Sequence, residues 1–405
     1  MGETAYKVYR YRWAVLVAFM LCVIANQLLW ITFAPITSDA AAFYGVSDLN
    51  IGLLSMSFMV TYLIVSIPAS WVIDTWGFRV AVGIGAILTG VFGLMRGLVG
   101  SDYTLVLIAQ IGIAIGQPFV NNAVTKVSAR WFPLNERATA SGFGTLAMYL
   151  GILGGMVLTP LISGGSGIEQ TLLIYGVGAS VIAVAFLVIA REHPPSPLGS
   201  PEDEERALMF DGLKQALKKR DFLLLMLIFF IGLGVFNAVT TWIEEIVSPR
   251  GFSSTEAGYA GGLMIVGGII GALVMPTLSD RYRRRVPFIV IALAGATVGL
   301  AGVTFAGGIS LLYLSAAVLG FFLLSSGPIG FQYGAEIARP TPEGTSNGLL
   351  LMMGQVSGIA FILGMDAFRE AETGAMTPSL AVMVGLMLLS VVVATRLHES
   401  ELLGA

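Results

Sequence analysis

The sequence predicts an all-α, polytopic membrane protein with twelve transmembrane helices in two pseudo-symmetric six-helix halves. Of its 405 residues, 56% are hydrophobic and only 12% are charged, whereas a soluble domain carries about 25% charged residues. The charged residues leave apolar gaps long enough for helices of about 20 residues to cross a bilayer. A short acidic-to-basic motif also occurs twice, as Asp74-Thr-Trp-Gly-Phe-Arg79 and as Asp280-Arg-Tyr-Arg-Arg-Arg285.

The N-terminal half, residues 1–190, is expected to hold six spans. The first apolar stretch is too long for a cleaved signal peptide, and no small-residue cleavage site follows it, so we predict that it is the first span. The six predicted spans cover residues 13–37, 49–73, 80–99, 103–127, 137–162 and 169–190.

A hydrophilic segment, residues 191–221, is predicted to be a cytoplasmic linker between the halves. It is first proline-rich, then acidic from Glu202 to Glu205, and finally basic from Lys214 to Arg220. The proline-rich part is typical of an extended linker, and residues 211–220 fit a short interfacial helix.

The C-terminal half, residues 222–405, is expected to hold the other six spans. Glycines recur in small-xxx-small pairs such as Gly267 and Gly271, which let helix backbones approach closely in lipid. The predicted spans cover residues 222–247, 255–279, 286–306, 309–337, 344–368 and 377–396.

The distribution of basic residues predicts that both termini are cytoplasmic. With that orientation, 19 of the 22 Lys and Arg residues lie in cytoplasmic segments or at their helix ends, and only Arg96, Arg250 and Arg369 lie outside. The positive-inside rule therefore favours an even number of spans. We expect a multi-pass protein of the cell (plasma) membrane.

Composition also excludes several classes of function. The net charge of −3 gives no basic excess for a nucleic-acid partner, and a single cysteine, Cys22, excludes an intrachain disulfide and a cysteine-based metal site. Both histidines, His193 and His398, fall in cytoplasmic segments, so no nucleophile–base pair or metal centre is expected in a span. We therefore expect no enzyme activity, metal or cofactor. The expected partners are the lipid bilayer and a small-molecule substrate, and the expected state is a monomer.

The repeated motif is predicted to form a gate at the cytoplasmic end of each half. Asp74 ends span two and Arg79 begins span three, while Asp280 and Arg281 occupy the corresponding place in the second half. Such charges can pair with neighbouring helix ends when the inner face is closed and separate when it opens. The alternative, strongest for the arginines after Asp280, is a signal of topology alone.

Polar residues deep in the spans are the candidate substrate contacts, because each is costly in lipid and tends to face the bundle interior. They lie mostly in spans one, four, seven and ten, which would line a central site. Each residue taken singly has an alternative role in joining helices. The candidates are Gln27, Trp30, Gln117, Asn121, Asn237, Trp242, Gln332 and Gln355.

Three acids are candidates for coupling transport to protons or cations. Glu244 and Glu245 lie near the outer end of span seven, and Glu336 lies near the inner end of span ten. No acid falls at mid-depth in a span, which favours facilitated transport. For the pair in span seven, the alternative is a solvated helix end.

Several longer runs of sequence carry a resemblance to a known family. They are Ala69-Ser-Trp-Val-Ile-Asp-Thr-Trp-Gly-Phe-Arg79, Val127-Ser-Ala-Arg-Trp-Phe-Pro133, and Pro342-Glu-Gly-Thr-Ser-Asn-Gly-Leu349 with Gln355-Val-Ser-Gly358. Through them the whole chain resembles the major facilitator superfamily, and more narrowly its feline leukaemia virus subgroup C receptor-related (FLVCR-like) group of solute carriers.

The resemblance implies a substrate class. Members of the group are associated with choline and ethanolamine uptake, and earlier with haem export. In choline-type members, a span-one Trp and a span-seven Tyr enclose the quaternary ammonium, and glutamines of spans four and eleven help to hold it. The Trp matches Trp30 and the glutamines match Gln117 and Gln355, but the Tyr position holds Asn237. Half of the aromatic cage is then missing unless Phe236, Trp242 or Tyr333 substitutes for the Tyr. An amine or another small polar solute is therefore as open as choline. Haem finds no axial histidine in the spans.

The sequence thus favours a secondary, facilitative transporter that moves a small polar or cationic organic solute by alternating access. Two alternatives stay open: a proton-coupled antiporter that exports amphipathic compounds, and a lyso-lipid flippase.

Overall fold

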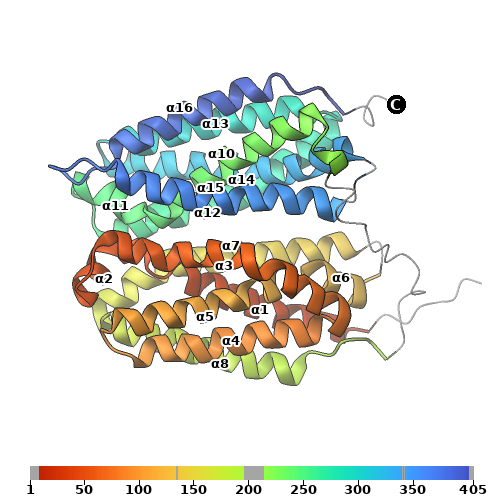
Figure 1. The fold of residues 1–405 in the computed structure, drawn as a ribbon, viewed down its shortest axis with the longest axis horizontal. Helices are drawn as coiled ribbons and strands as arrows, with labels where there is room; N and C mark the ends of the chain where they lie inside the picture. The colour runs from red at the N-terminus through yellow and green to blue at the C-terminus, as the bar shows by residue number, and fades with distance from the viewer. Residues whose placement is uncertain (1–8, 134–135, 196–213, 340, 342, 401–405) are drawn as a thin grey trace, which may run out of the picture. The chain divides into compact units, whose positions relative to one another are not determined.

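The computed structural model describes residues 9–133, 136–195, 214–339, 341 and 343–400. The acidic run Glu202–Glu205 and the start of the predicted interfacial helix, residues 211–213, lie outside the described residues. Within the described part, every regular element is a helix (Figure 1).

The first half contains six membrane-length helical segments; the first is divided into three helices and the fourth into two. The elements are α1 (Tyr11–Ile31), η1 (Ala34–Ile36), α2 (Thr37–Tyr44), α3 (Asp48–Trp76), α4 (Phe78–Leu98), α5 (Tyr103–Asn121), α6 (Val124–Trp131), α7 (Arg137–Ser166) and α8 (Ile168–Ile189).

The second half repeats this order, and its first segment is likewise followed by a short helix. The elements are α10 (Arg220–Thr241), α11 (Ile243–Val247), η3 (Ser248–Arg250), α12 (Ser254–Tyr282), α13 (Val286–Phe305), α14 (Ile309–Ala338), α15 (Glu343–Ala367) and α16 (Thr377–Ala394).

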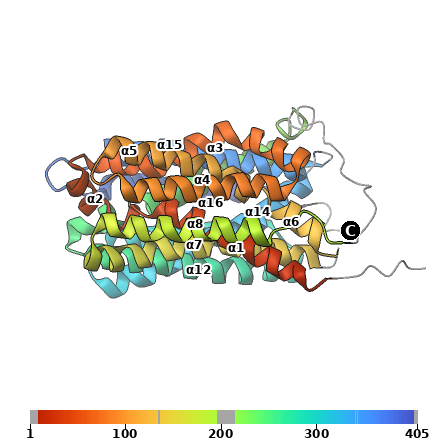
Figure 2. The ribbon, with the colours of Figure 1, turned by 90° about the horizontal axis from the view of Figure 1, so that it is seen from below.

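Among the described residues, 12 helical segments are long and apolar enough to cross a membrane. Each overlaps one of the predicted spans, so the predicted all-α fold with twelve spans is confirmed. The chain divides into two compact units, Met1–Glu204 and Glu205–Ala405. In each unit the helices run side by side along a common direction (Figures 1 and 2).

The two units use the same helix pairings. In the first, α1 packs on α7, α3 on α5, and α4 on both α5 and α8; in the second, α10 packs on α15, α12 on α14, and α13 on both α14 and α16. These pairs occupy equivalent positions in the order of the six segments. The duplication suggested by the repeated motif therefore extends to the packing of the whole half.

Close packing in the second half depends on glycine. A side chain at Gly267 or Gly271 of α12 would overlap the backbone carbonyls of Ala317 and Phe321 on α14. The two backbones can approach this closely because neither glycine carries a Cβ, as expected for a small-xxx-small pair.

The break in span one was not predicted, since this span was expected to run unbroken from residue 13 to 37. Instead, α1 ends at Ile31 and the chain continues as η1, whose second residue is Pro35. Proline has no N–H to continue the helix ladder, so a break is favoured there. Pro118 is near the end of α5, which stops at Asn121 before α6 begins.

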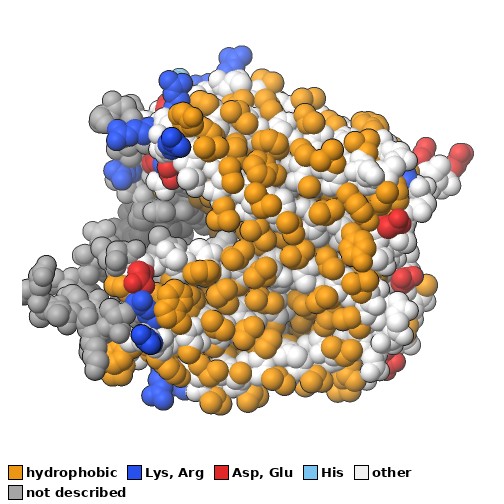
Figure 3. All heavy atoms as spheres, turned by 180° about the vertical axis from the view of Figure 1, so that it is seen from behind, with side chains coloured by type: hydrophobic (Ala, Val, Ile, Leu, Met, Phe, Trp, Pro, Cys, Tyr) orange, Lys and Arg blue, Asp and Glu red, His pale blue; other side chains and the backbone are white. Residues whose placement is uncertain are grey.

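The surface pattern suits a lipid environment. Large hydrophobic side chains such as Ile64, Val188 and Leu273 are exposed along the helices, each with more than 60% of its surface accessible. On the face shown in Figure 3, hydrophobic side chains cover the helices along their length, and Lys and Arg side chains gather at one end of each half. Each half is therefore apolar where it meets lipid and charged at its helix ends.

Candidate functional site

Trp30 lies in the last turn of α1 and is buried, with 7% of its surface exposed. Its indole Nε1 donates to the backbone carbonyl of Ser55 on α3 at 3.1 Å. The ring of Phe58, one turn further along α3, lies 6.4 Å from the Trp30 ring, centroid to centroid. The sequence did not indicate Phe58, and the two rings form an aromatic pair on the first half.

Gln27 lies one turn before Trp30 on α1, and the Cβ of Gln27 packs against Gly151 of α7. It is buried, and its Nε2 has no hydrogen-bond partner in the described part of the chain. A buried amide donor without an acceptor is costly in a folded protein, which makes Gln27 a group able to bind a solute.

The neighbouring Asn26 has the structural role that was the alternative for every polar candidate. Its Nδ2 donates to Thr89 Oγ1 of α4 at 3.0 Å and to the carbonyl of Ile113 of α5 at 3.3 Å. These bonds join three helices within the first half, as polar residues do in membrane bundles.

Gln117 and Asn121 lie one turn apart on α5. Gln117 is 8% exposed, and Asn121 Oδ1 has no partner among the described residues. The next residue, Asn122, accepts from the Tyr62 hydroxyl at 2.8 Å and donates to Ser66 Oγ at 3.1 Å, both on α3. The α5 segment thus has one amide that joins helices and two that are open to another partner.

In the second half, Asn237 and Gln355 lie on packed helices. Asn237 Nδ2 of α10 donates to the backbone carbonyl of Gly354 on α15 at 3.1 Å, immediately before Gln355. Trp242, by contrast, is fully buried and its indole Nε1 donates to the carbonyl of Ile362 at 3.1 Å. The structure therefore brings Asn237 beside the turn that carries Gln355, and it assigns the indole of Trp242 to an internal bond.

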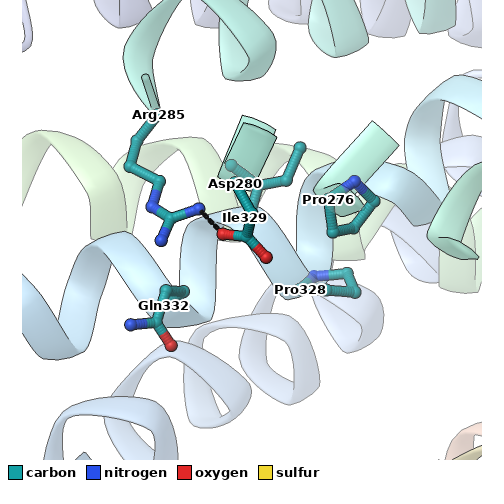
Figure 4. A pocket seen from close by; sticks show the side chains of 6 residues that line it. All are labelled: Pro276, Asp280, Arg285, Pro328, Ile329 and Gln332. Carbon is teal, nitrogen blue, oxygen red and sulfur yellow. Dashed lines mark hydrogen bonds and ion pairs between the residues drawn. The ribbon is translucent and has the colours of Figure 1, made fainter. Parts of the chain in front are cut away.

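Gln332 lies apart from these residues, at the pocket shown in Figure 4. The pocket has a volume of about 400 Å³ and is lined by residues of α12, α14 and the start of α13. Gln332 Nε2 donates to Glu336 Oε1 at 3.0 Å. The lining residues are Pro276, Asp280, Arg285, Pro328, Ile329 and Gln332.

Arg285 is the centre of the charge network at this pocket. Its guanidinium forms an ion pair with Asp280 and another with Glu336 at 3.1 Å, and only 8% of its side chain is exposed. Although burial acts to lower the pKa of Arg285, its hydrogen bonds to Asp280 and Glu336 raise the pKa above the ordinary value. The partner of Asp280 is therefore Arg285. Arg281 is exposed, with no carboxylate within 4.0 Å among the described residues.

The first copy of the motif makes a weaker contact. Asp74 is 3.6 Å from Lys126 Nζ at the start of α6, and 72% of the Asp74 side chain is exposed. Among the described residues, the Arg79 guanidinium reaches only the carbonyl of Leu187, at 3.5 Å. An exposed pair of this kind contributes about 0–1 kcal/mol.

Two carboxylates that the sequence did not indicate complete the gate loops. Glu192, just after α8, accepts from the backbone N–H of Phe78 and Arg79, and Glu399, after α16, accepts from that of Arg285 and Val286. Each carboxylate satisfies N–H groups at the start of a helix, where negative charge is favoured.

The candidate coupling acids are all in polar contacts. Glu244 and Glu245 are buried, with 3% and 1% exposed. Ser254 Oγ donates to Glu244 at 2.9 Å, and Glu245 forms an ion pair with Arg369. In the part of the chain that is described, no group of three or more His, Cys, Asp or Glu could hold a metal ion.

Arg96 is the least expected polar residue of the first half. It lies near the end of α4, is 1% exposed, and donates to the backbone carbonyl of Leu29 at 2.8 Å. Sequence position alone had placed it near the outer end of a span.

The duplicated six-helix halves, the apolar surface and the buried polar groups on packed spans define a secondary membrane transporter. A family model described as "Major Facilitator Superfamily" matches residues 15–362, and the chain belongs to that superfamily. Within it, the chain is related to solute carrier family 49. It is 30% identical over 377 residues to solute carrier family 49 member A3 of Danio rerio, covering 89% of this chain and 79% of the relative.

Human FLVCR2, named a choline/ethanolamine transporter, is 26% identical over 381 residues, covering 88% of this chain and 72% of that protein. Among solved structures, the nucleoside transporter NupG superposes with a TM-score of 0.73 at 14% identity, covering 95% of this chain and 99% of the other. A bacterial homologue of the human lysosomal transporter Spinster gives 0.71 at 17% identity, covering 97% and 98%. At these identities the structures support the fold alone. The chain is a multi-pass integral membrane protein that transports small molecules.

Proposed function

We propose that this protein is a facilitative transporter for a small organic cation with an ammonium group, and that it works by alternating access. The observation that carries the proposal is the Trp30–Phe58 aromatic pair with the open amide of Gln27, one turn before Trp30 on α1. Aromatic faces attract an ammonium by about 0.5–2 kcal/mol each, and amides hold the polar end of the solute. Relatives named as choline/ethanolamine transporters support the same class.

Asn237 shifts the preference within this class toward amines that carry N–H groups. Its Nδ2 is bonded to Gly354, and its Oδ1 has no partner among the described residues, so the side chain offers an acceptor. A primary ammonium such as that of ethanolamine can donate to this oxygen, whereas the quaternary ammonium of choline cannot. The second half therefore favours ethanolamine-like solutes over choline.

The gate residues have distinct parts in the proposed cycle. With both termini cytoplasmic, the Asp74 and Asp280 loops lie at the inner end of each half. We assign the stronger hold on this end to the Asp280, Arg285 and Glu336 network, because its Arg285–Glu336 pair is buried whereas the contact of Asp74 is exposed.

The test is solute uptake and binding by the purified protein in liposomes. Saturable uptake of ethanolamine or choline is expected, and Trp30→Ala should abolish it. Because loss of a buried Trp costs about 3–5 kcal/mol, the folding of this variant is checked by its melting temperature and by size-exclusion chromatography. Phe58→Leu, which keeps the apolar volume, should weaken binding several-fold. Unchanged uptake by a folded Trp30→Ala protein would show that the solute is held elsewhere.

A second candidate is proton-coupled export of amphipathic compounds, favoured by the burial of Glu244 and Glu245 in α11. It predicts transport that responds to an imposed pH gradient and that loses this response in Glu244→Gln or Glu336→Gln. Transport of a lyso-lipid but not of choline or ethanolamine would instead favour a flippase.

A further inference from the structure

The end of α1 is a helix C-terminus buried inside the first half. The helix stops at Ile31, and Pro35 cannot supply the N–H that a continuing helix would give to the carbonyl of Ile31. The last carbonyls of a helix lack partners from within the helix. In a hydrocarbon environment, each unsatisfied group costs several kcal/mol. The structure must therefore supply donors at this point.

Arg96 supplies them from the neighbouring helix α4. Its Nη1 donates to the carbonyl of Leu29 at 2.8 Å, and its Nη2 donates to Thr32 Oγ1 at 3.2 Å. The hydroxyl of Thr32 in turn donates to the carbonyl of Leu28 at 2.8 Å. Trp30 lies between Leu29 and Thr32, so the guanidinium holds the backbone on both sides of the candidate substrate residue.

Gln110 of α5 fixes the direction of the guanidinium. Its Oε1 accepts from Arg96 Nη1 at 2.8 Å, and its Nε2 lies 3.5 Å from the carbonyl of Leu29. The ring of Phe33 lies 5.2 Å from the guanidinium carbon. Three helices, α1, α4 and α5, thus meet at one fully buried cation.

The electrostatics of this cation are unusual. No carboxylate lies within 4.0 Å of Arg96 in the described part of the chain, although the guanidinium is always charged in proteins. A buried cation normally needs a carboxylate partner. Here the compensating charge is the negative end of the α1 dipole, about half an elementary charge, together with the carbonyl and hydroxyl oxygens.

Carriers with broken helices often bind a cation at such a place, where helix C-termini and unwound carbonyls coordinate Na⁺ or H⁺. We propose that Arg96 is a positioning residue that takes the place of such an ion, as a tethered cation that holds the end of α1 and so orients Trp30 toward the solute. The inference rests on the proposed role of Trp30 and adds that the first half needs no bound cation to set its site.

Arg250 provides a matched control. Its guanidinium also donates to backbone carbonyls at helix ends, those of Ile246, Val303 and Ala306 at 2.8–3.1 Å, but it belongs to the second half. Loss of either arginine removes one charge and three hydrogen bonds to oxygen acceptors. Only the loss of Arg96 should change the orientation of Trp30 and so weaken solute binding.

The experiment measures binding of ethanolamine, choline and tetramethylammonium to the full-length protein by the shift of its melting temperature. Arg96→Ala should weaken binding about tenfold or more, Arg96→Lys less, and Arg250→Ala by less than twofold. Guanidinium ion at low millimolar concentration should restore binding in Arg96→Ala, with no gain in the wild type or in Arg250→Ala. Wild-type affinity in folded Arg96→Ala, or equal rescue of Arg250→Ala, overturns the inference.

Should Arg96→Ala fail to fold, Thr32→Val tests the same idea. It removes the acceptor of Arg96 Nη2 and keeps the shape of the side chain, so binding should weaken two- to fivefold; unchanged affinity counts against the inference. Trp30→Ala separates the two proposals. Lost binding in Trp30→Ala with normal binding in Arg96→Ala overturns the role of Arg96 alone, whereas normal binding in Trp30→Ala overturns the proposed solute contact.

Discussion

Glu192 accepts a 2.7 Å hydrogen bond from the backbone N–H of Arg79, 113 residues earlier in the chain. In the second half, Glu399 accepts a 2.7 Å hydrogen bond from the backbone N–H of Arg285, 114 residues earlier. In both halves, the chain just after the sixth span binds the start of the third. The gate loops are therefore fixed from both sides, by their own helices and by the end of the half.

Neutralising these carboxylates should loosen the loops. Glu192→Gln and Glu399→Gln each remove a negative charge from a helix N-terminus, and we expect each to cost about 1 kcal/mol of stability. The melting temperature of the purified protein measures the change. Glu372→Gln, at an exposed residue between α15 and α16, is the control and should have no effect. Equal effects of all three changes would contradict a role in the loops.

The two gate loops should differ in strength. Arg285→Gln leaves two carboxylates without their buried partner, which should cost about 3–5 kcal/mol. Asp74→Asn breaks only the exposed contact with Lys126, which should cost less than about 1 kcal/mol. Thermal unfolding of the two variants measures the difference, and a double-mutant cycle of Arg285→Gln with Glu336→Gln isolates the buried pair. A coupling energy near zero would show that the Arg285–Glu336 pair does not stabilise the folded protein.

A residue in the second loop carries a backbone strain that the first loop avoids. Arg283, three residues after Asp280, has a φ of +51°, whereas Gly77, three residues after Asp74, has a φ of +85°. The left-handed conformation costs a residue with a Cβ about 1 kcal/mol, and glycine adopts it freely. Arg283→Gly should therefore raise the melting temperature.

Arg281→Gly is the control for this change, because it removes the same charge inside the last turn of α12. Glycine in a helix costs about 1 kcal/mol, so the melting temperature should fall. If both variants shift in the same direction, charge rather than backbone conformation decides the effect.

The twelve-span fold could be predicted because the positions of charged residues along the chain mark where each apolar span begins and ends. The break after Ile31 was not predicted, because Thr32 and Phe33 are as compatible with a continuing apolar span as their neighbours; the local signal for it is Pro35, which cannot donate to the carbonyl of Ile31. Nor did the sequence indicate the bonds of Arg96 to α1, whose residues lie 64–67 positions earlier in the chain. The bonds of Glu192 to the start of α4, 113–114 positions earlier, were likewise not indicated. Such pairs depend on how helices pack. The one signal for these contacts in the sequence is that Glu192 and Glu399 follow their gate loops at nearly the same spacing.

The site was predictable only in part for the same reason. Depth in a span selected the partly accessible Trp30 and Asn237, and it equally selected Trp242, which has no exposed surface and whose indole bonds to the carbonyl of Ile362. Hydropathy places a side chain along a helix and does not say which neighbour it faces. Direction around the helix decides whether an amide joins helices, as Asn26 does, or stays open, as Gln27 does.

Asn237 should control the choice between ethanolamine and choline. Asn237→Ala removes the bond to Gly354, costing about 1–2 kcal/mol of stability, and it also removes the open Oδ1. Because only a primary ammonium can donate to that oxygen, affinity for ethanolamine should fall about five- to tenfold while affinity for choline changes little. Asn26→Ala is the control, since Asn26 is also a buried asparagine that joins helices. It should lower stability and leave the ratio of the two affinities unchanged. A ratio that stays constant in Asn237→Ala would mean that this amide serves packing alone.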